Sequence, residues 1–74
     1  MDKNVRKFYN IRVWKNGKFL GYVSIKSDKI LRITKDMKDR VVCMNSMTAE
    51  IKAEMYIEEY SSSGYYFDYI SYLA

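Results

Sequence analysis

The sequence predicts an α+β fold, in which an antiparallel sheet of four to five strands has one α-helix packed on one face. Three observations predict it. An Asn-Gly pair stands between two runs rich in β-branched and aromatic residues, a later stretch free of glycine and proline has helical amphipathicity, and an alternating aromatic run follows it. No repeat, linker or change of composition divides the 74 residues, so we expect a single domain spanning residues 1–74.

The first two strands are predicted over residues 8–15 and 18–25, joined by Asn16-Gly17. Asn-Gly between two β-forming runs is a strong hairpin signal, because a type I′ turn needs positive φ at both central residues. A regular ladder then makes five cross-strand pairs, which are Lys15–Lys18, Trp14–Phe19, Val13–Leu20, Arg12–Gly21 and Ile11–Tyr22. Such a ladder places Ile11, Val13, Leu20 and Tyr22 on one face, and Phe8, Asn10, Arg12, Trp14, Phe19, Val23 and Ile25 on the other.

The middle of the chain is less regular. Ser27-Asp28-Lys29 is typical of a turn, and Ile30–Thr34 is predicted as a third strand in which Leu31 and Ile33 share a face. Residues 35–39 are polar enough for a connecting loop. The short run Val41–Met44 fits either a fourth strand or a packed approach to the helix.

A helix is predicted over Met47–Tyr60, with Ser46 as its N-cap. At 100° per residue, one stripe suited to packing on the sheet contains Ala49, Ala53, Tyr56, Ile57 and Tyr60. A second, narrower apolar row consists of Met47, Ile51 and Met55 and is bordered by Glu50, Glu54 and Glu58. The helix therefore has apolar surface beyond what one sheet face needs.

The helix is expected to end at Ser61–Gly64, where the glycine suits a left-handed cap. The last strand is predicted over Tyr65–Leu73. Its alternation places Tyr65, Phe67, Tyr69, Ser71 and Leu73 on one side, and Tyr66, Asp68, Ile70 and Tyr72 on the other.

The composition points away from catalysis. The chain has no histidine and one cysteine, so the usual zinc-ligand sets, His-based triads and internal disulfides are not available. The carboxylate pairs along the helix are best interpreted as a solvated face, and Cys43 as a small buried residue. Asp36 and Asp39 lack the spaced oxygen donors of a calcium loop. We expect no enzyme, no metal and no cofactor.

Targeting signals are not evident. No apolar run approaches the length of a membrane span, and Met1–Asn4 lacks the apolar segment of a signal peptide. We therefore expect a cytoplasmic protein without a membrane partner.

Charge is unevenly distributed along the chain. Residues 1–40 contain twelve Lys or Arg and four Asp, whereas residues 41–74 contain one Lys and five acids. This asymmetry predicts a basic and an acidic face that could steer a charged partner, although solvated surfaces explain it equally well. Basic residues among aromatic ones on the first hairpin also fit a nucleic-acid platform, but no RNA-binding signature is present.

The excess of aromatic and apolar residues is consistent with binding to a protein, with a homodimer as one variant. The alternative is that the extra aromatic residues fill a core that the helix and a loop cover fully. We expect apolar partner contacts at Trp14, Phe19, Met47, Ile51 and Met55, because such residue types dominate interface hot spots. Steering or polar contacts are expected at Arg12, Lys15 and Lys18. A subunit or accessory factor of a larger assembly fits the same pattern.

The layout resembles that of small proteins encoded by phages and mobile elements of low-GC Gram-positive bacteria. The segments that carry the resemblance are Asn16-Gly17-Lys18, Phe19–Val23, Ile33–Asp36, the helix opened by Ser46, and Phe67–Ile70. Proteins of this kind include anti-CRISPR proteins, which look like single-purpose inhibitors acting by surface occlusion. The resemblance implies a viral protein that inhibits a host protein or ribonucleoprotein of bacterial defence. Unlike DNA-mimicking anti-CRISPR proteins, this chain is basic overall. A small nucleic-acid-binding or regulatory protein is the alternative.

Overall fold

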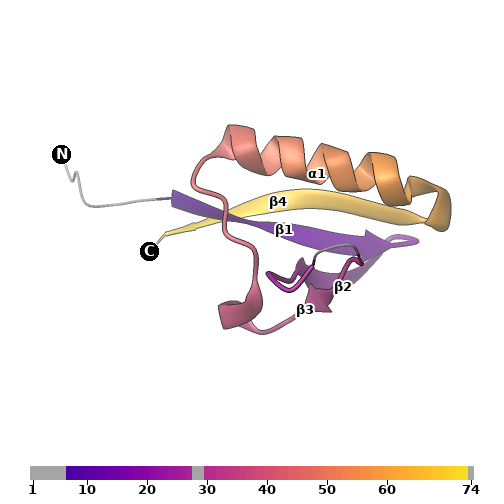
Figure 1. Ribbon diagram of the computed structural model, residues 1–74, viewed down its shortest axis with the longest axis horizontal. Coiled ribbons are helices and arrows are strands. Elements are labelled where there is room, and N and C mark those ends of the chain that lie inside the picture. Colours follow the sequence, from indigo (N-terminus) through magenta and orange to yellow (C-terminus); the bar gives the residue numbers. More distant parts are fainter. Residues whose placement is uncertain (1–6, 28–29, 74) are drawn as a thin grey trace.

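The computed structural model describes residues 7–27 and 30–73, so most of the predicted turn at residues 27–29 and the N-terminal segment at residues 1–4 lie outside the described residues. The elements, in chain order, are β1 (Lys7–Lys15), β2 (Lys18–Val23), β3 (Ile33–Thr34), the 3₁₀ turn η1 (Met37–Asp39), α1 (Ser46–Tyr60), the 3₁₀ turn η2 (Ser61–Ser63) and β4 (Tyr65–Leu73). The strands form one antiparallel sheet in the order β3-β2-β1-β4. Helix α1 packs on one face of it (Figure 1), which confirms the α+β fold class.

The predicted hairpin turn is present. Asn16 and Gly17 have φ values of 51° and 80°, as a type I′ turn requires. Lys15 pairs with Lys18 and Trp14 with Phe19, so the register is as predicted next to the turn.

Beyond those two pairs the predicted register is wrong. A β-bulge inserts Leu20, so that Val13 pairs with Gly21 and Arg12 with Tyr22, one residue later than a regular ladder. The bulge lies beside a close backbone approach. Gly21 has a φ of 150°, and a Cβ there would lie 2.8 Å from the carbonyl oxygen of Thr34 in β3. Glycine therefore permits β2 to bend against its neighbour.

The bulge also reverses the faces predicted for the residues of β2 that follow it, as Val23 and Tyr22 show. Val23, predicted beside Trp14 and Phe19, is instead fully buried with Ile11 and Val13 on the face that α1 covers. Tyr22 moves to the opposite face. The exchange follows from the two-residue period of a strand, because one inserted residue moves every later side chain to the other side.

The third strand is shorter than predicted. Only Ile33–Thr34 of the predicted run Ile30–Thr34 pairs with β2. Val41–Met44 forms no strand and is the packed approach to the helix. Within it, Cys43 exchanges two 2.9 Å backbone hydrogen bonds with Tyr9, forming an isolated bridge.

Helix α1 starts one residue earlier than predicted. Its N-cap is Asn45, whose Oδ1 accepts a 2.8 Å hydrogen bond from the backbone N–H of Thr48, so the assignment of this role to Ser46 was wrong. Both residue types cap helices well, and the turn leading from Cys43 decides between them. At the other end, Gly64 adopts a φ of 84°, which confirms the left-handed turn.

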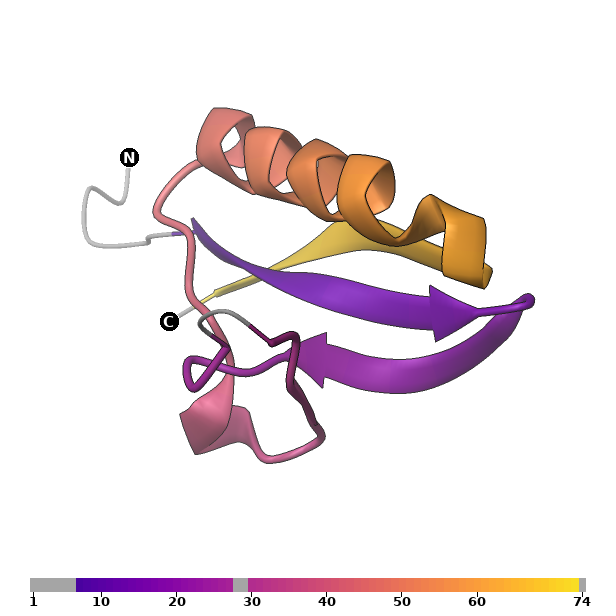
Figure 2. The ribbon, with the colours of Figure 1, turned by 45° about the vertical axis from the view of Figure 1, so that its right-hand side comes forward.

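The core lies between α1 and the sheet (Figure 2). Ala49 and Ala53 are buried, and Tyr56, Ile57 and Tyr60 pack against the core, which confirms the predicted stripe. Phe67 is 1% exposed and stacks on Tyr56 with ring centroids 5.2 Å apart. The buried apolar residues are Ile11, Val13, Val23, Cys43, Ala49, Ala53 and Phe67.

Candidate functional site

The face of the sheet opposite α1 is rich in aromatic side chains. Across β1 and β4, Trp14 pairs with Tyr66 and Arg12 with Asp68. The bulge adds Tyr22 beside Arg12 on the same face. Together these residues form what we term the open-face cluster, which consists of Arg12, Trp14, Phe19, Tyr22, Tyr66 and Asp68.

Asp68 is the polar centre of the open-face cluster. Its carboxylate accepts hydrogen bonds from Arg12 Nε at 2.8 Å and Arg12 Nη2 at 2.6 Å, and a third from Trp14 Nε1 at 3.1 Å. The hydrogen bond to Asp68 raises the pKa of Arg12 above its ordinary value, although desolvation opposes it. A bidentate pair of this kind fixes both side chains in one geometry.

The aromatic rings of the cluster pack edge to face. The centroids of Trp14 and Phe19 are 5.2 Å apart with an interplanar angle of 64°, and those of Phe19 and Tyr22 are 5.6 Å apart with an angle of 81°. This arrangement matches the positive edge of one ring to the negative face of the next. The rings of the cluster therefore pack against one another, and two of its side chains reach the surface, with Phe19 38% and Tyr66 55% exposed.

Guanidinium groups cover two of these rings. The Arg12 Cζ atom lies 5.4 Å from the Trp14 ring centroid, and the Arg40 Cζ atom lies 3.6 Å from that of Tyr22. Both distances are in the range of cation–π attraction. One face of Trp14 and one face of Tyr22 are thus occupied by cations of the protein itself.

The structure brings together Arg12, Trp14 and Phe19 among the predicted contact residues. Lys15 and Lys18 are exposed at the hairpin end and pair with each other. Lys15 Nζ lies 4.9 Å from the ring centroid of Tyr65, whose side chain packs with the core. These two lysines therefore belong to the α1 side of the sheet, not to the open-face cluster.

The second apolar row of the helix lies away from the open-face cluster. Met47, Ile51 and Met55 are 71%, 53% and 60% exposed on the outer side of α1. Because this row lies on the side of α1 turned away from the sheet, and the open-face cluster lies on the sheet face that α1 does not cover, the predicted contact residues do not form one site.

The contact residues predicted from the sequence do not include Tyr22, Tyr66 or Asp68, nor Arg40, which stacks on Tyr22. Tyr22 was assigned to the opposite face, although a glycine inside a strand, here Gly21, is a known sign of a bulge. Arg40 has no local signal, because its contact with Tyr22 depends on how the loop carrying η1 folds back. The alternation of the last strand did place Tyr66 and Asp68 together.

Groups suited to covalent or metal chemistry are sparse in the described part of the chain. Residues 7–27 and 30–73 contain no cluster of three or more His, Cys, Asp or Glu side chains placed to hold a metal ion. Cys43 is buried, and burial raises the pKa of its thiol, with a smaller opposing effect from Lys52. A thiol kept protonated in this way is a poor nucleophile.

None of the helices in the described residues has the length and apolar character needed to cross a membrane.

Comparison with known proteins identifies no relative: no protein-family model matches this chain, and searches of curated proteins and of solved structures return no match.

Proposed function

We propose that this protein is a non-enzymatic binding protein that attaches to a partner protein through the open-face cluster and acts by covering the partner's surface. The observation that carries the proposal is the aromatic sheet face held in place by Asp68. Well-packed aromatic and arginine side chains are the groups that dominate the binding energy of protein interfaces. Exposed rings at Phe19 and Tyr66 supply the apolar contact.

The chemistry of the cluster favours a protein over a nucleic acid. Base stacking needs open ring faces, and the guanidinium groups of Arg12 and Arg40 occupy one face each of Trp14 and Tyr22. The charge of Arg12 is also matched by Asp68. The partner surface that fits is apolar at its centre and carries an acidic group within reach of Arg40.

Within this function, our proposal is a phage or mobile-element inhibitor of a host macromolecule in the bacterial cytoplasm, with a CRISPR-Cas component as the favoured target. Its support is the layout of the hairpin, helix and final aromatic strand, together with a binding face in a chain of 74 residues. Surface occlusion needs no further chemistry from the inhibitor.

A tagged-protein capture from a Gram-positive host lysate, with and without nuclease, tests the proposal. We expect one stoichiometric, nuclease-resistant partner. The double variant Phe19→Ala/Tyr66→Ala should reduce its affinity at least tenfold, because both side chains are exposed and their loss leaves the core intact. The matched control is Ile51→Ala on the outer side of α1, which should keep the affinity of the unmodified protein.

Two results would contradict the proposal. The first is full retention of the partner by the double variant. The second is a partner lost on nuclease treatment, with an affinity that falls steeply as salt rises, because phosphate contacts release counterions. That outcome would instead support a small nucleic-acid-binding or regulatory protein.

A further inference from the structure

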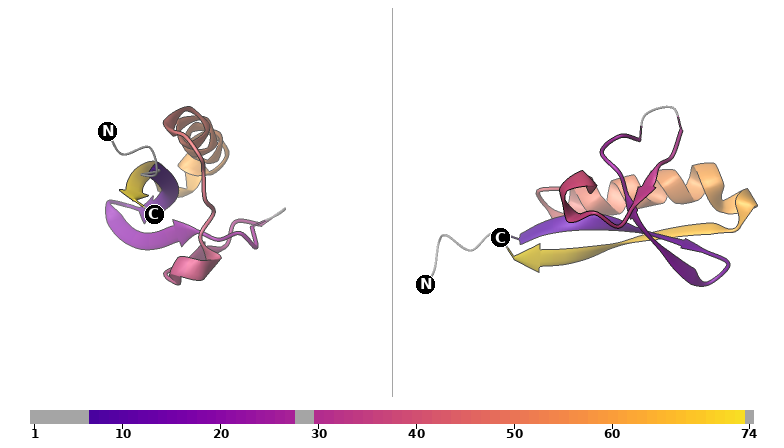
Figure 3. Two further views of the ribbon diagram at one scale, coloured as in Figure 1. Left: turned by 90° about the vertical axis from the view of Figure 1, so that its left-hand side faces the viewer. Right: turned by 90° about the horizontal axis from the view of Figure 1, so that it is seen from below.

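Strand β4 is a long open edge of the sheet. The strand order ends at β4, which has nine residues, and no described segment runs along its outer side in the view from below (Figure 3). Proteins usually protect such an edge with proline, charges or a covering loop. Tyr65–Leu73 has no proline, and its one charged residue, Asp68, is already paired with Arg12.

The hydrogen bonds of β1 show which groups of β4 face outward. Tyr9 directs its N–H and C=O to Cys43, on the β2 side of β1, whereas the N–H of Asn16 donates to the carbonyl of Gly64 on the β4 side. Because these directions alternate along a strand, the even-numbered residues of β1 bond to β4, and the register pairs even with even. The outward N–H and C=O groups therefore belong to the odd-numbered residues of β4, which include Tyr65, Phe67, Tyr69 and Ser71.

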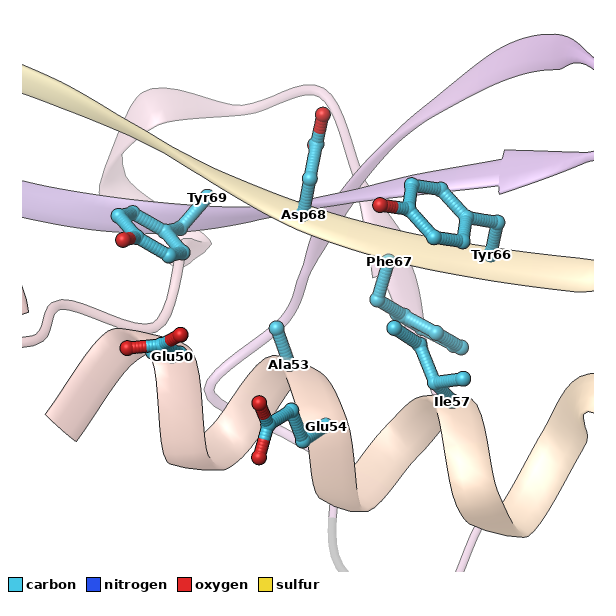
Figure 4. A pocket seen from close by; sticks show the side chains of 8 residues that line it. All are labelled: Glu50, Ala53, Glu54, Ile57, Tyr66, Phe67, Asp68 and Tyr69. Atoms are coloured by element: carbon cyan, nitrogen blue, oxygen red, sulfur yellow. The ribbon is translucent and has the colours of Figure 1, made fainter. Parts of the chain in front are cut away.

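A groove of about 260 Å³ runs along this edge, between β4 and α1 (Figure 4). Its walls are Tyr66–Tyr69 of β4 and four residues of α1, namely Glu50, Ala53, Glu54 and Ile57. Phe67 and Tyr69 point toward α1, whereas Asp68 points away from it. The groove thus lies beside outward-facing backbone groups of β4.

The residues of the groove follow one another in a definite order. Figure 4 shows Glu50 opposite Tyr69, Ile57 opposite Phe67, and Glu54 between them. Both glutamates are exposed, and neither forms an ion pair with a described residue. One end of the groove is therefore acidic and the other apolar.

We propose that the free edge of β4 and this groove accept an extended segment of a partner protein as a fifth strand. Antiparallel pairing, the more stable arrangement, makes the segment pass Glu50 first, then Glu54, then Ile57. Glu50 and Ile57 are seven residues apart on the helix and so about 10.5 Å apart along its axis, a length that three to four residues of a strand span at about 3.4 Å each. The segment that matches the groove therefore has five residues, with basic residues at its first and third positions, opposite the two glutamates, and an apolar residue at its fifth, opposite Ile57.

A second copy of the chain fits this edge poorly. Two β4 edges joined antiparallel would leave both α1 helices on the same side of the combined sheet. With the two-fold axis at the middle of the groove, Glu54 of one copy would face Glu54 of the other, and these like charges would repel. Charge complementarity thus selects a basic segment of a different protein.

This inference goes beyond the proposed function, because it uses the edge of the sheet and not its open face. Its probe is the blocked peptide acetyl-Thr-Lys-Thr-Lys-Thr-Val-Thr-amide, and the control peptide has Glu in place of both Lys. Fluorescence anisotropy compares their affinities, and amide chemical shifts locate the bound peptide. We expect at least tenfold preference for the basic peptide, with the largest shifts at Phe67 and Tyr69.

Two pairs of variants test the charges and the backbone separately. Glu54→Lys should abolish the preference for the basic peptide, whereas Glu58→Lys, an exposed change outside the groove, should leave it unaltered. Ser71→Pro removes an outward N–H without touching the β1–β4 ladder. It should weaken binding at least fivefold relative to Ser71→Ala, with the fold verified by circular dichroism.

Four results would overturn the inference. The first three are equal affinity for the basic and acidic peptides, a preference that survives Glu54→Lys, and a stable dimer in which the β4 amides are protected. The fourth is a set of shifts confined to the open-face cluster, which would leave the proposed function intact.

Discussion

Arg12 and Asp68, 56 residues apart in the chain, face each other across β1 and β4 and are joined by two hydrogen bonds of 2.8 and 2.6 Å. Each side chain is 29% exposed. The pair ties β1, an inner strand of the sheet, to the edge strand β4 on the face that α1 does not cover.

Breaking this pair should destabilise the fold. We expect Asp68→Ala to lower the free energy of unfolding by about 1–2 kcal/mol, because it leaves Arg12 and Trp14 Nε1 without their acceptor. The double variant Arg12→Leu/Asp68→Leu should cost less than the sum of its single changes, because it leaves neither charge unpaired. Urea denaturation of Asp68→Ala and of the four proteins of the leucine cycle measures both effects, and strict additivity in the cycle would contradict the coupling.

Gly21 should resist substitution more than Gly17. Both have positive φ, but a Cβ at Gly17 meets nothing within 4 Å, whereas a Cβ at Gly21 would lie 2.8 Å from the Thr34 carbonyl oxygen. We expect Gly17→Ala to cost about 1 kcal/mol from backbone conformation alone. Gly21→Ala should cost at least about 1 kcal/mol more, measured by thermal denaturation. Equal losses of stability for Gly17→Ala and Gly21→Ala would contradict this prediction, because they would mean that β3 shifts to accommodate the added Cβ.

Alanine substitution at the start of α1 should lower stability more at Asn45 than at Ser46. Asn45→Ala removes the side chain that accepts from Thr48 N–H and should cost about 1 kcal/mol. Ser46→Ala should cost no more than about 0.3 kcal/mol, because Ser46 is the first helical residue and not the cap. If chemical denaturation showed a larger loss of unfolding free energy for Ser46→Ala than for Asn45→Ala, the N-cap would be Ser46.

A change in side-chain size should affect stability on the buried side of α1 much more than on its exposed side. Ala53 is 4% exposed against the sheet, so Ala53→Leu should destabilise by about 1–3 kcal/mol through overpacking. Ile51 is 53% exposed, and Ile51→Ala should stay within about 0.5 kcal/mol of the unmodified protein. Denaturation midpoints give both values. A large loss at Ile51 would show that the outer row is covered, for example in a dimer.

Stability should fall at alkaline pH. Burial raises the pKa of Cys43 and of Tyr56, so both groups keep their protons in the folded state after the unfolded chain has lost them. Their contribution is therefore fully present below the unfolded pKa values and declines as pH rises, from about pH 8.5 for the thiol and about pH 10 for the phenol. Tyr56→Phe should make the decline above pH 10 shallower in a series of urea titrations. An unchanged slope would contradict the assignment to Tyr56.

Local patterns predicted well those features whose causes are local. The Asn16-Gly17 turn follows from the backbone freedom of two residues, and the alternation of β4 follows from the strand period. The stripe containing Ala49 and Ala53 follows from the helical period in the same way. Each depends on neighbours within a few positions, so the printed sequence contains the necessary information.

The candidate site could be predicted only in part. Arg12, Trp14 and Phe19 lie next to the turn, where the register is secure, and they do share a face. Tyr22 lies beyond the bulge, and its face could not be derived from a regular ladder. Arg40 reaches Tyr22 from a loop whose path has no periodic signal.

By itself, the sequence determined the fold class, the hairpin turn, the buried side of the helix and the alternating faces of the last strand, because backbone sterics and hydrophobic period act over short stretches. Only the tertiary structure decided the bulge at Leu20, the pairing of Arg12 with Asp68 and the position of β4 at the edge of the sheet. These depend on which distant segments lie side by side. A one-residue slip in that packing reverses every side chain that follows, so local preference cannot settle it.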